Sequence, residues 1–565
     1  MNRVAYNILL ALIAIAAVLI TGFWCFADAA TYYVRKDGNN SCNGTVDAAG
    51  SSGNCAKLTI QAGVNLAGNP GDTVTIHAGS YSETPTTHAS GSAGNYITIQ
   101  AYSGDTVTLT SMTVNHNYNI IKGLTFTGDG TGSNVEMTHN GNHNQIIYNT
   151  FLGNVNCCTY GEGGSYGIQD EGSGSNFIDH NVFDGQNNGN ATAICIAIYM
   201  QTTTSGNQIT YNTIKNDSTP GRLFEIYGAN HVIAHNEVYG TSDQGCSSQV
   251  HVDLFQGFAS SSSNILVEYN YFHDLNSQFV MLADDPADGG TQGIINHWTF
   301  RNNIYANIQQ AGFIKSEYIV FYNNTFYNVG PGAGTNPLLW STDSEGWGDN
   351  GAFINNIMIT TANQGVGSDG TTIANNYWGT PTYGAYNAPE GTNYVNGGNP
   401  QFVAPYSNCI TNTCNFAIGS TSIVIDKGQT ISSFSDDYIG TSRPQGAAWD
   451  IGAYEYSSGT TTYTVSTSAG TNCASLSCVP SSVASGGTSV CTNTPNPNYY
   501  TSSMSGCGTP NWISGNVYSP TITGNCTVTS VCTANPATQE RTFNFGSGGN
   551  RQIISSPGAH NIKVQ

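Results

Sequence analysis

The stretch QITYNTIKNDSTPGRLFEIYGANHVIAHNEV, residues 208–238, decides the fold. It contains the phrase ITYNTI, centred on Asn212, and then the phrase IAHNEV, centred on Asn236. In each phrase apolar and polar residues alternate, which predicts a strand, because successive side chains of a strand point to opposite faces. One short β-unit therefore repeats within this stretch.

The same phrase recurs along the middle of the chain. Its asparagines follow one another at uneven intervals, and the shortest intervals recur, so one short unit carries loops of variable length. Such a unit has room for three short strands and three turns, which is one coil of a parallel β-helix. A β-propeller, the alternative, has longer and more uniform periods. Stacked coils align the asparagines in a hydrogen-bonded ladder: Asn149, Asn181, Asn212, Asn236, Asn270, Asn302, Asn324, Asn355 and Asn376.

Charge narrows the range of partners. The 565 residues include 35 Asp and Glu but only 14 Lys and Arg, a formal net charge of −21. This excess argues against nucleic acid and anionic membrane surfaces as partners. It is compatible with neutral sugars, or with acidic sugars bridged by divalent cations.

The N-terminus predicts export. Arg3 precedes an apolar run at 8–20, and Ala27-Asp28-Ala29 is a small-x-small cleavage pattern, so residues 1–29 are expected to form a signal peptide. A retained membrane anchor is the alternative, but the apolar run is short for a span. We expect a secreted or cell-surface protein without membrane insertion after cleavage.

The cysteines agree with an oxidising compartment, because an even number, fourteen, remains when Cys25 is set aside with the signal peptide. We expect the pairs Cys42/Cys55 and Cys409/Cys414 to close local loops. Six cysteines follow a linker-like stretch after residue 456, and they allow fifteen pairings: Cys473, Cys478, Cys491, Cys507, Cys526 and Cys532.

The six cysteines and Thr-rich alternating strands predict a small disulfide-rich β module at 457–534. It resembles the repeat modules appended to bacterial cell-surface proteins. Residues 535–565 are rich in Gly and Ser and are expected to form a tail or a partial further module.

Two stretches resemble the pectate-lyase-like superfamily. One is TYYVRKDGNN…KLTIQAGVNLAGNPGDTVTIHAGSYSE from residue 31, and the other is TSRPQGAAWDIGAYEY, ending at Tyr456. The resemblance implies an all-β fold, a right-handed parallel β-helix over 30–456, with an amphipathic capping helix at 58–67. It leaves the reaction open, because this fold carries lyases, hydrolases, epimerases and inert adhesins.

A pair of carboxylates is the main candidate for chemistry. Asp253 precedes Asn270 by the same distance along the chain as Asp285 precedes Asn302, and equal offsets predict neighbouring coils. Asp284 adjoins Asp285, and His251 is one same-face step from Asp253. Paired carboxylates hydrolyse glycosides or bind calcium, which neutralises a uronate in lyases, and the histidine is a plausible proton carrier. Aspartates that cap backbone amides in Gly-rich turns are the alternative.

Further candidates lie in other coils. Arg222 and Glu225, one coil before Asp253, are expected to bind substrate, and Trp298 to stack on a sugar ring unless it packs in the core. FIKSEYIVFYNNTFYN loosely resembles the lysine-bearing coil of β-helical alginate and chondroitin lyases, which implies Lys315 as a base and Glu317 as a metal ligand. The His-Gly segment with its Arg that follows in that family has no counterpart in GDNGAFINN.

These features predict a secreted carbohydrate-active protein, a polysaccharide lyase or glycoside hydrolase that acts in a groove on the β-helix flank. Calcium, with Asp284, Asp285 and Glu317 as ligands, is the expected cofactor if there is one. The expected partner is an extracellular polysaccharide, and the protein is expected to be monomeric or surface-associated. The alternative is a non-catalytic cell-surface or adhesive protein that binds polysaccharide.

Overall fold

The structure is a computed structural model of the chain. The predicted signal peptide lies, except for Ala29, outside the described residues, among which no helix is long and apolar enough to cross a membrane. The structure describes residues 29–128, 132–153, 165–172, 174–185, 194–216, 222–241, 253–284, 286, 290–310, 312–330, 350–359, 371–379, 391–457, 462–484, 486–496, 499–507, 516–534, 539–543, 551–555 and 563–564.

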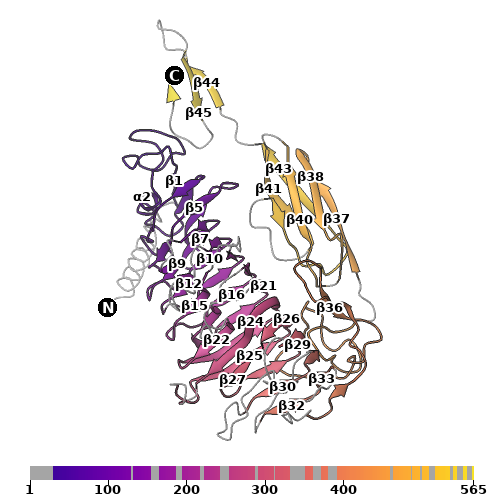
Figure 1. The fold of residues 1–565 in the computed structure, drawn as a ribbon. Coiled ribbons are helices and arrows are strands. Elements are labelled where there is room, and N and C mark those ends of the chain that lie inside the picture. Colours follow the sequence, from indigo (N-terminus) through magenta and orange to yellow (C-terminus); the bar gives the residue numbers. More distant parts are fainter. Residues whose placement is uncertain are drawn as a thin grey trace, which may run out of the picture.

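The predicted right-handed parallel β-helix is confirmed (Figure 1). Each full coil adds one strand to each of three parallel ladders, which we call sheets A, B and C. Sheet A contains, in stacking order, β1 (Thr31–Val34), β2 (Thr73–Ile76), β4 (Ile97–Ala101), β7 (Asn119–Lys122), β10 (Gln145–Ile147), β13 (Phe177–Asp179), β16 (Gln208–Thr210), β20 (Val232–Ala234), β23 (Ser262–Glu268), β25 (Ile295–Arg301), β28 (Val320–Tyr322), β30 (Ala352–Ile354) and β32 (Thr372–Ala374), with β19 (Gly228–Ala229) beside β23.

Sheets B and C share one long strand, β24 (Tyr271–Ala283), which passes from one to the other. Sheet B contains β3 (Gly79–Tyr81), β5 (Val107–Leu109), β8 (Thr125–Phe126), β11 (Thr150–Leu152), β14 (Val182–Asp184), β17 (Thr213–Lys215), β21 (Glu237–Thr241), the first part of β24, β26 (Ile304–Gln310), β29 (Thr325–Val329), β31 (Ile357–Ile359), β33 (Tyr377–Trp378) and β34 (Val395–Asn396). Sheet C contains β6 (Met112–Val114), β9 (Gly132–Met137), β12 (Ser165–Asp170), β15 (Ile196–Met200), β18 (Arg222–Ile226), β22 (Asp253–Phe258), the second part of β24 and β27 (Phe313–Lys315).

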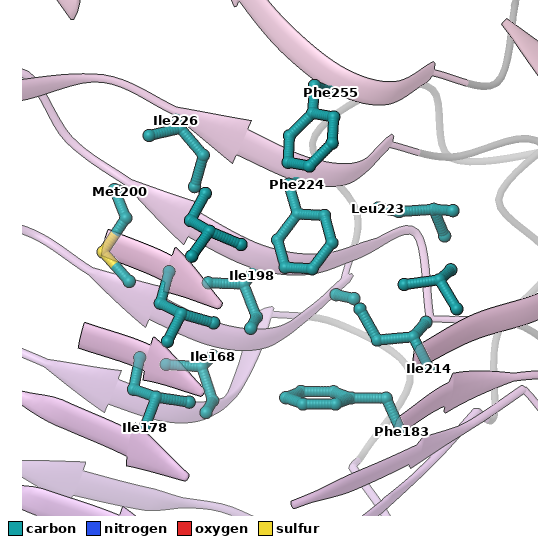
Figure 2. Packing of buried hydrophobic residues seen from close by; sticks show 14 of the residues in the cluster. Ile168, Ile178, Phe183, Ile198, Met200, Ile214, Leu223, Phe224, Ile226 and Phe255 are labelled. Atoms are coloured by element: carbon teal, nitrogen blue, oxygen red, sulfur yellow. The ribbon is translucent and has the colours of Figure 1, made fainter. Parts of the chain in front are cut away.

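Apolar side chains fill the solenoid in columns, because parallel pairing places equivalent residues of successive coils above one another. Phe224 and Phe255 stack with ring centroids 5.1 Å apart. Figure 2 shows this column beside Ile198 and Ile226, all of them buried. The core is therefore continuous along the axis.

The predicted asparagine ladder lies at the turn from sheet A to sheet B. The backbone N–H of Asn212 donates to Oδ1 of Asn236 at 2.9 Å, and the N–H of Asn236 donates to Oδ1 of Asn270 at 2.8 Å. Seven predicted members of the ladder are confirmed, but the assignment of Asn302 and Asn355 to the ladder is wrong. Their places are taken by the residues that follow them, so the ladder continues from Asn270 through Asn303, Asn324, Asn356 and Asn376.

Asn302 and Asn355 instead have positive φ values of 51° and 61° and point to the outside of the turn. Asn302 Nδ2 donates to the carbonyl of Asp436 at 3.0 Å, and Asn355 Nδ2 donates to that of Gln429 at 2.7 Å. Asn323 and Asn375 bind the same C-terminal segment, residues 427–456, in the same way, through the carbonyls of Asp450 and Lys427. We call residues 427–456 the closing segment. Each doubled asparagine therefore serves the ladder with its second member and holds the closing segment with its first.

In earlier coils the same outer position carries aromatic residues. Their rings stack with centroids 4.7–5.0 Å apart, in the order Tyr148, His180, Tyr211, His235 and Tyr269. Tyr269 ends the stack and donates its hydroxyl to Asp436 Oδ1 at 2.7 Å. The closing segment thus begins to cover the turn where the aromatic stack stops.

A second ladder, which the sequence analysis missed, lies at the turn from sheet C to sheet A. It runs through Asn119, Asn144, Asn176 and Asn207, and the backbone N–H of each of the first three donates to Oδ1 of the next. His231 takes the next place and accepts the N–H of Asn207 with Nδ1 at 3.1 Å.

The C-terminal end of the solenoid domain is anchored by one buried arginine. Arg443 pairs with Glu455 at 2.9 Å, both with fully buried side chains, and also donates to the carbonyls of Asp450 and Gly452. The two strands of this region, β35 (Phe402–Ala404) and β36 (Asn415–Ile418), pair antiparallel. The stretch that resembled a superfamily closing segment therefore packs on the last coils.

At the other end, α2 (Ile60–Val64) is shorter than the helix predicted at 58–67. Thr59 caps it by accepting the N–H of Ala62 with its side chain. A Cβ on Gly63 would lie 2.4 Å from Val34 and 3.1 Å from Val74, so the helix packs closely on β1 and β2.

The predicted disulfide-rich module is a pair of small sheets around a common apolar core. Of the fifteen possible pairings, the structure has Cys473–Cys532, Cys478–Cys491 and Cys507–Cys526. One sheet contains β37 (Thr462–Ala469), β39 (Ser482–Ala484), β41 (Tyr499–Ser505) and β43 (Cys526–Ala534), and the other β38 (Cys473–Val479), β40 (Val490–Pro495) and β42 (Val517–Tyr518). Beyond it, β44 (Gln539–Phe543), β45 (Arg551–Ser555) and β46 (Lys563–Val564) pair antiparallel.

Candidate functional site

A row of polar side chains runs along the outer face of sheet C. Phe224 and Ile226 point into the core (Figure 2), so Glu225 between them faces outward. Pairing in register carries this outward position through six successive coils, about 4.8 Å apart. We call these residues the polar row: Glu136, Gln169, Tyr199, Glu225, Gln256 and Met281.

Glu225 is the best-held carboxylate of the row. Arg222 Nη1 donates to its Oε2 at 2.9 Å, and the Tyr227 hydroxyl donates to its Oε1 at 2.9 Å. Burial, and next the charge of Glu225, raise the pKa of Tyr199 to about 12. Burial also raises the pKa of Tyr227. Tyr199 and Tyr227 therefore stay neutral at physiological pH, and each keeps a hydroxyl that can donate a hydrogen bond.

A pair of carboxylates, Glu136 and Glu171, lies at the N-terminal end of the row. Glu171 is two residues beyond Gln169, which is in register with Glu136, so the two glutamates are diagonal neighbours on one face. Gln169 Nε2 donates to Glu171 Oε1 at 3.1 Å, and Ser133 donates to Gln169 Oε1. Burial, and next the charge of Glu171, raise the pKa of Glu136.

Gln256 leaves an acceptor unused. It is only 2% exposed, and its Oε1 accepts no hydrogen bond from the described residues. Its Nε2 lies 3.9 Å from Met281 Sδ. A buried amide oxygen without a donor is costly, so this position favours a ligand that brings a donor.

Three of the predicted site residues lie on adjacent strands of sheet C. Arg222 is in register with Asp253, and Glu225 with Gln256, so the predicted neighbours Arg222, Glu225 and Asp253 lie on adjacent strands of sheet C. Asp253 is fully buried.

The prediction paired Asp253 with Asp285, which lies outside the described residues, but its neighbour Asp284 does not lie close to Asp253. Asp253 pairs with Gln278 in the next coil, and Asp284 lies six residues beyond Gln278. At about 3.3 Å per residue, the two aspartates are separated by about 20 Å along the strand direction. Asp284 accepts the Ile295 N–H at 3.0 Å and the Ser316 hydroxyl at 3.3 Å, so it is a backbone-capping carboxylate. His251 and Asp285 lie outside the described residues.

Equal offsets from the ladder do not place residues side by side on sheet C, for two reasons. The true ladder residue is Asn303, not Asn302, which changes one offset by one residue. In addition, β24 crosses directly from sheet B to sheet C, whereas residues 242–252 intervene between β21 and β22 one coil earlier. Distance along the chain from the ladder therefore does not report position on sheet C.

Lys315 and Glu317 do not join Asp253. Lys315 pairs with Ala283, five residues beyond the partner of Asp253 and one further coil along, and Glu317 accepts a hydrogen bond from Gln292 at 3.1 Å. The pKa of Asp284 is raised, mainly by burial. Asp284 and Glu317 belong to no group of three close metal-ligating side chains among the described residues, and the third predicted calcium ligand, Asp285, lies outside them.

The prediction that Trp298 stacks on a sugar is wrong, because its side chain is fully buried in the core. Trp298 occupies the position that asparagine holds in the second ladder of earlier coils. There Ile265 and Trp298 are in register and replace the polar ladder with apolar packing.

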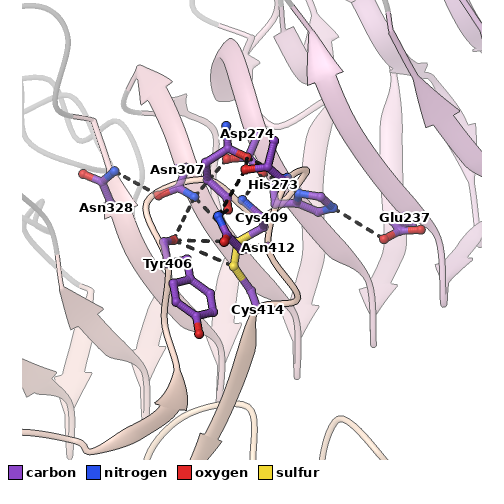
Figure 3. Close-up of a disulfide and its surroundings, with 11 residues drawn as sticks. Glu237, His273, Asp274, Asn307, Asn328, Tyr406, Cys409, Asn412 and Cys414 are labelled. Atoms are coloured by element: carbon purple, nitrogen blue, oxygen red, sulfur yellow. Dashed lines mark hydrogen bonds and ion pairs between the residues drawn. A yellow bond between two sulfur atoms is a disulfide. The ribbon is translucent and has the colours of Figure 1, made fainter.

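One cluster of metal-ligating residue types exists among the described residues: His273, Asp274 and Cys409. Cys409 is bonded to Cys414, as the sequence predicted, so its sulfur is not a thiolate (Figure 3). Asp274 accepts the Cys409 N–H at 2.8 Å and lies 2.8 Å from His273 Nδ1. The cluster fastens a loop to sheet B.

Four residues of the polar row could have been found from a pattern in the sequence. Short strand phrases in successive coils, IQD, IYM, FEI and FQG, place one polar or aromatic residue directly after a core residue: Gln169, Tyr199, Glu225 and Gln256. Aligning these phrases, rather than counting from the ladder, identifies the outward column.

No family model and no curated protein sequence matches this chain. Similar solved structures include pectate lyase Pel9A, with 16% identity, a TM-score of 0.40, and coverage of 76% of this chain and 97% of that chain. Another is XylC in complex with xylose, with 11% identity, a TM-score of 0.40, and coverage of 75% and 98%. A third is the A-module of mannuronan C-5 epimerase AlgE6 from Azotobacter vinelandii, with 14% identity, a TM-score of 0.40, and coverage of 60% and 94%.

Proposed function

We propose that this protein is exported and hydrolyses an extracellular polysaccharide bound along the polar row of sheet C. The observation that carries the proposal is the row itself, six outward side chains at regular coil spacing with Arg222 and Tyr227 beside Glu225. A linear glycan laid along the solenoid axis would pass one position of the row at every coil, of which four are partly exposed and two, Glu225 and Gln256, are buried.

Hydrolysis is favoured over elimination by the charges on this face. Glycoside hydrolysis uses two carboxyl groups, and Glu225, Glu136 and Glu171 lie on the outer face of sheet C, whereas Asp253 is fully buried and lies an odd number of positions from Glu225 in register. Elimination from a uronate needs a cation at the sugar carboxylate, and Arg222 is already paired with Glu225.

Export is supported by the disulfides. Five of them lie within the described residues, two in the solenoid domain and three in the C-terminal module. Structural disulfides persist in oxidising compartments. Attachment to the cell surface through the module, and a requirement for calcium, stay predictions.

A non-catalytic polysaccharide-binding protein is the second candidate. It is favoured by the state of Glu225, which is 5% exposed and has both oxygens engaged by Arg222 and Tyr227. A carboxylate held in this way serves equally well to keep a binding wall rigid.

Incubation of the purified protein with a panel of polysaccharides, in calcium and in EDTA, separates these functions. New reducing ends without ultraviolet absorbance of an unsaturated product indicate hydrolysis, and absorbance indicates elimination. Glu225→Gln should abolish the release of reducing ends, measured below the melting temperature of the variant, which the loss of the ion pair with Arg222 should lower. Binding without any product supports the second candidate, and neither binding nor product across the panel refutes both.

A further inference from the structure

One buried acceptor on sheet C has no donor. Gln256 is only 2% exposed, and its Oε1 accepts no hydrogen bond from the described residues. The other arm of the amide does have a neighbour, because Nε2 lies 3.9 Å from Met281 Sδ in the following coil. A buried carbonyl oxygen without a donor lowers the stability of the folded chain. A polar side chain that is kept at such a position points to a donor that arrives with a ligand.

The donors beside the neighbouring carboxylate are already used. Gln256 is in register with Glu225, about 4.8 Å away across the two strands. Arg222 Nη1 and the Tyr227 hydroxyl both donate to Glu225, each at 2.9 Å. Burial raises the pKa of Tyr227, so its hydroxyl keeps its proton and stays bound to the carboxylate. Gln256 therefore places an open acceptor directly beside an occupied carboxylate.

The charges around Gln256 do not suit an anionic sugar. Arg222 and Glu225 form an ion pair, so their charges cancel locally. Lys315 is the only other lysine or arginine in the described strands of sheet C, and it lies two coils beyond Gln256, about 10 Å along the axis. A carboxylate brings acceptors and a negative charge, and Gln256 Oε1 is itself an acceptor. The site therefore favours an uncharged group that donates a hydrogen bond.

We propose that Gln256 determines specificity in the polar row, because its Oε1 accepts a hydrogen bond from a hydroxyl group of a neutral sugar bound beside Glu225. The inference rests on the proposed function and names its substrate class, a neutral polysaccharide rather than a polyuronate. The hydroxyl becomes enclosed together with a buried acceptor, and a site of this kind discriminates strongly against a sugar without the donor. Tyr199, on the other side of Glu225 in the row and partly exposed, offers an aromatic ring to the adjoining sugar.

The test is binding, measured by calorimetry on the full-length protein in EDTA. The ligands are oligomers of glucose, mannose and galactose, each paired with the uronic acid oligomer that differs from it only by a carboxylate in place of the hydroxymethyl group. We expect at least one neutral oligomer to bind about tenfold more tightly than its uronic acid counterpart. Uronic acid oligomers that bind as tightly as their neutral counterparts overturn the inference.

Gln256→Met tests the residue itself, since methionine has a similar length and only a weak acceptor. The variant should bind the preferred neutral oligomer about tenfold more weakly than the wild type does. Its denaturant midpoint should stay the same or rise, because a buried unpaired oxygen is removed. Unchanged affinity overturns the inference, because the oxygen of Gln256 then meets water or no donor at all.

Gln208→Met is the matched control, because it makes the same change at an exposed position of sheet A, outside the polar row. It should keep both the affinity and the preference for the neutral oligomer. A loss of affinity as large as that of Gln256→Met would overturn the inference. Tight binding of uronic acid oligomers refutes this inference alone, whereas no binding of any oligomer refutes the proposed function as well.

Discussion

His231 makes the solenoid sensitive to acid. It occupies the second ladder after four asparagines, is fully buried, and accepts the Asn207 N–H with Nδ1 at 3.1 Å. Its Nε2 lies 3.1 Å from the Tyr227 carbonyl, so the ring must be neutral with its proton on Nε2. Protonation of Nδ1 would place one N–H against another and break the ladder at this coil.

The size of the effect follows from the pKa. Burial lowers the pKa of His231 from 6.5 to about 4. Between these values the unfolded chain binds more protons than the folded one, so the free energy of unfolding falls as the pH falls through this window. Each pKa unit corresponds to about 1.4 kcal/mol, which makes about 3.4 kcal/mol over the whole window and about 2.5 kcal/mol at about pH 4.5.

The perturbation is His231→Asn, which restores the residue of the earlier coils. The free energy of unfolding, measured with urea, should fall in both proteins between about pH 7.5 and about pH 4.5. In the variant this fall should be about 2.5 kcal/mol smaller than in the wild type. His139→Asn, at an exposed histidine, should behave like the wild type. Parallel losses in wild type and His231→Asn would refute the reasoning.

Three further substitutions test the packing, each measured by the denaturant midpoint. Phe255→Ala opens a cavity in the stacked column and should cost about 3–5 kcal/mol; a loss below about 1 kcal/mol would mean that the column is not packed as described. Asn236→Ala breaks the first ladder by removing an acceptor for the Asn212 N–H and should cost about 1–3 kcal/mol, whereas the neighbouring His235→Ala should cost less because it leaves the ladder intact. Tyr305→Phe should stabilise the protein by about 1 kcal/mol, because the hydroxyl is buried in the core without a partner among the described residues; destabilisation would reveal a hidden hydrogen bond.

The regular part of the solenoid was accessible from the sequence. Phrases such as ITYNTI carry their strand preference and their inward asparagine within a few positions, so neither depends on distant contacts. The same holds for the local disulfides Cys42–Cys55 and Cys409–Cys414, whose partners are close in the chain.

The candidate site was accessible only in part. Arg222, Glu225 and Asp253 do lie on adjacent strands, because β18 and β22 are consecutive strands of sheet C. Asp284 does not join them, because it lies just beyond the end of the long strand β24, six residues after the residue that pairs with Asp253. A single added or lost residue moves every following side chain to the other face.

By itself, the sequence determined that this protein stacks short strands in coils around an asparagine ladder, since that information is local and repeated. Only the tertiary structure decided which member of each doubled asparagine enters the ladder, because the closing segment, which is distant in sequence, takes the other member. It also decided which carboxylates share a face, because that depends on the length of each loop between strands, and loop length is the one part of the coil that does not repeat.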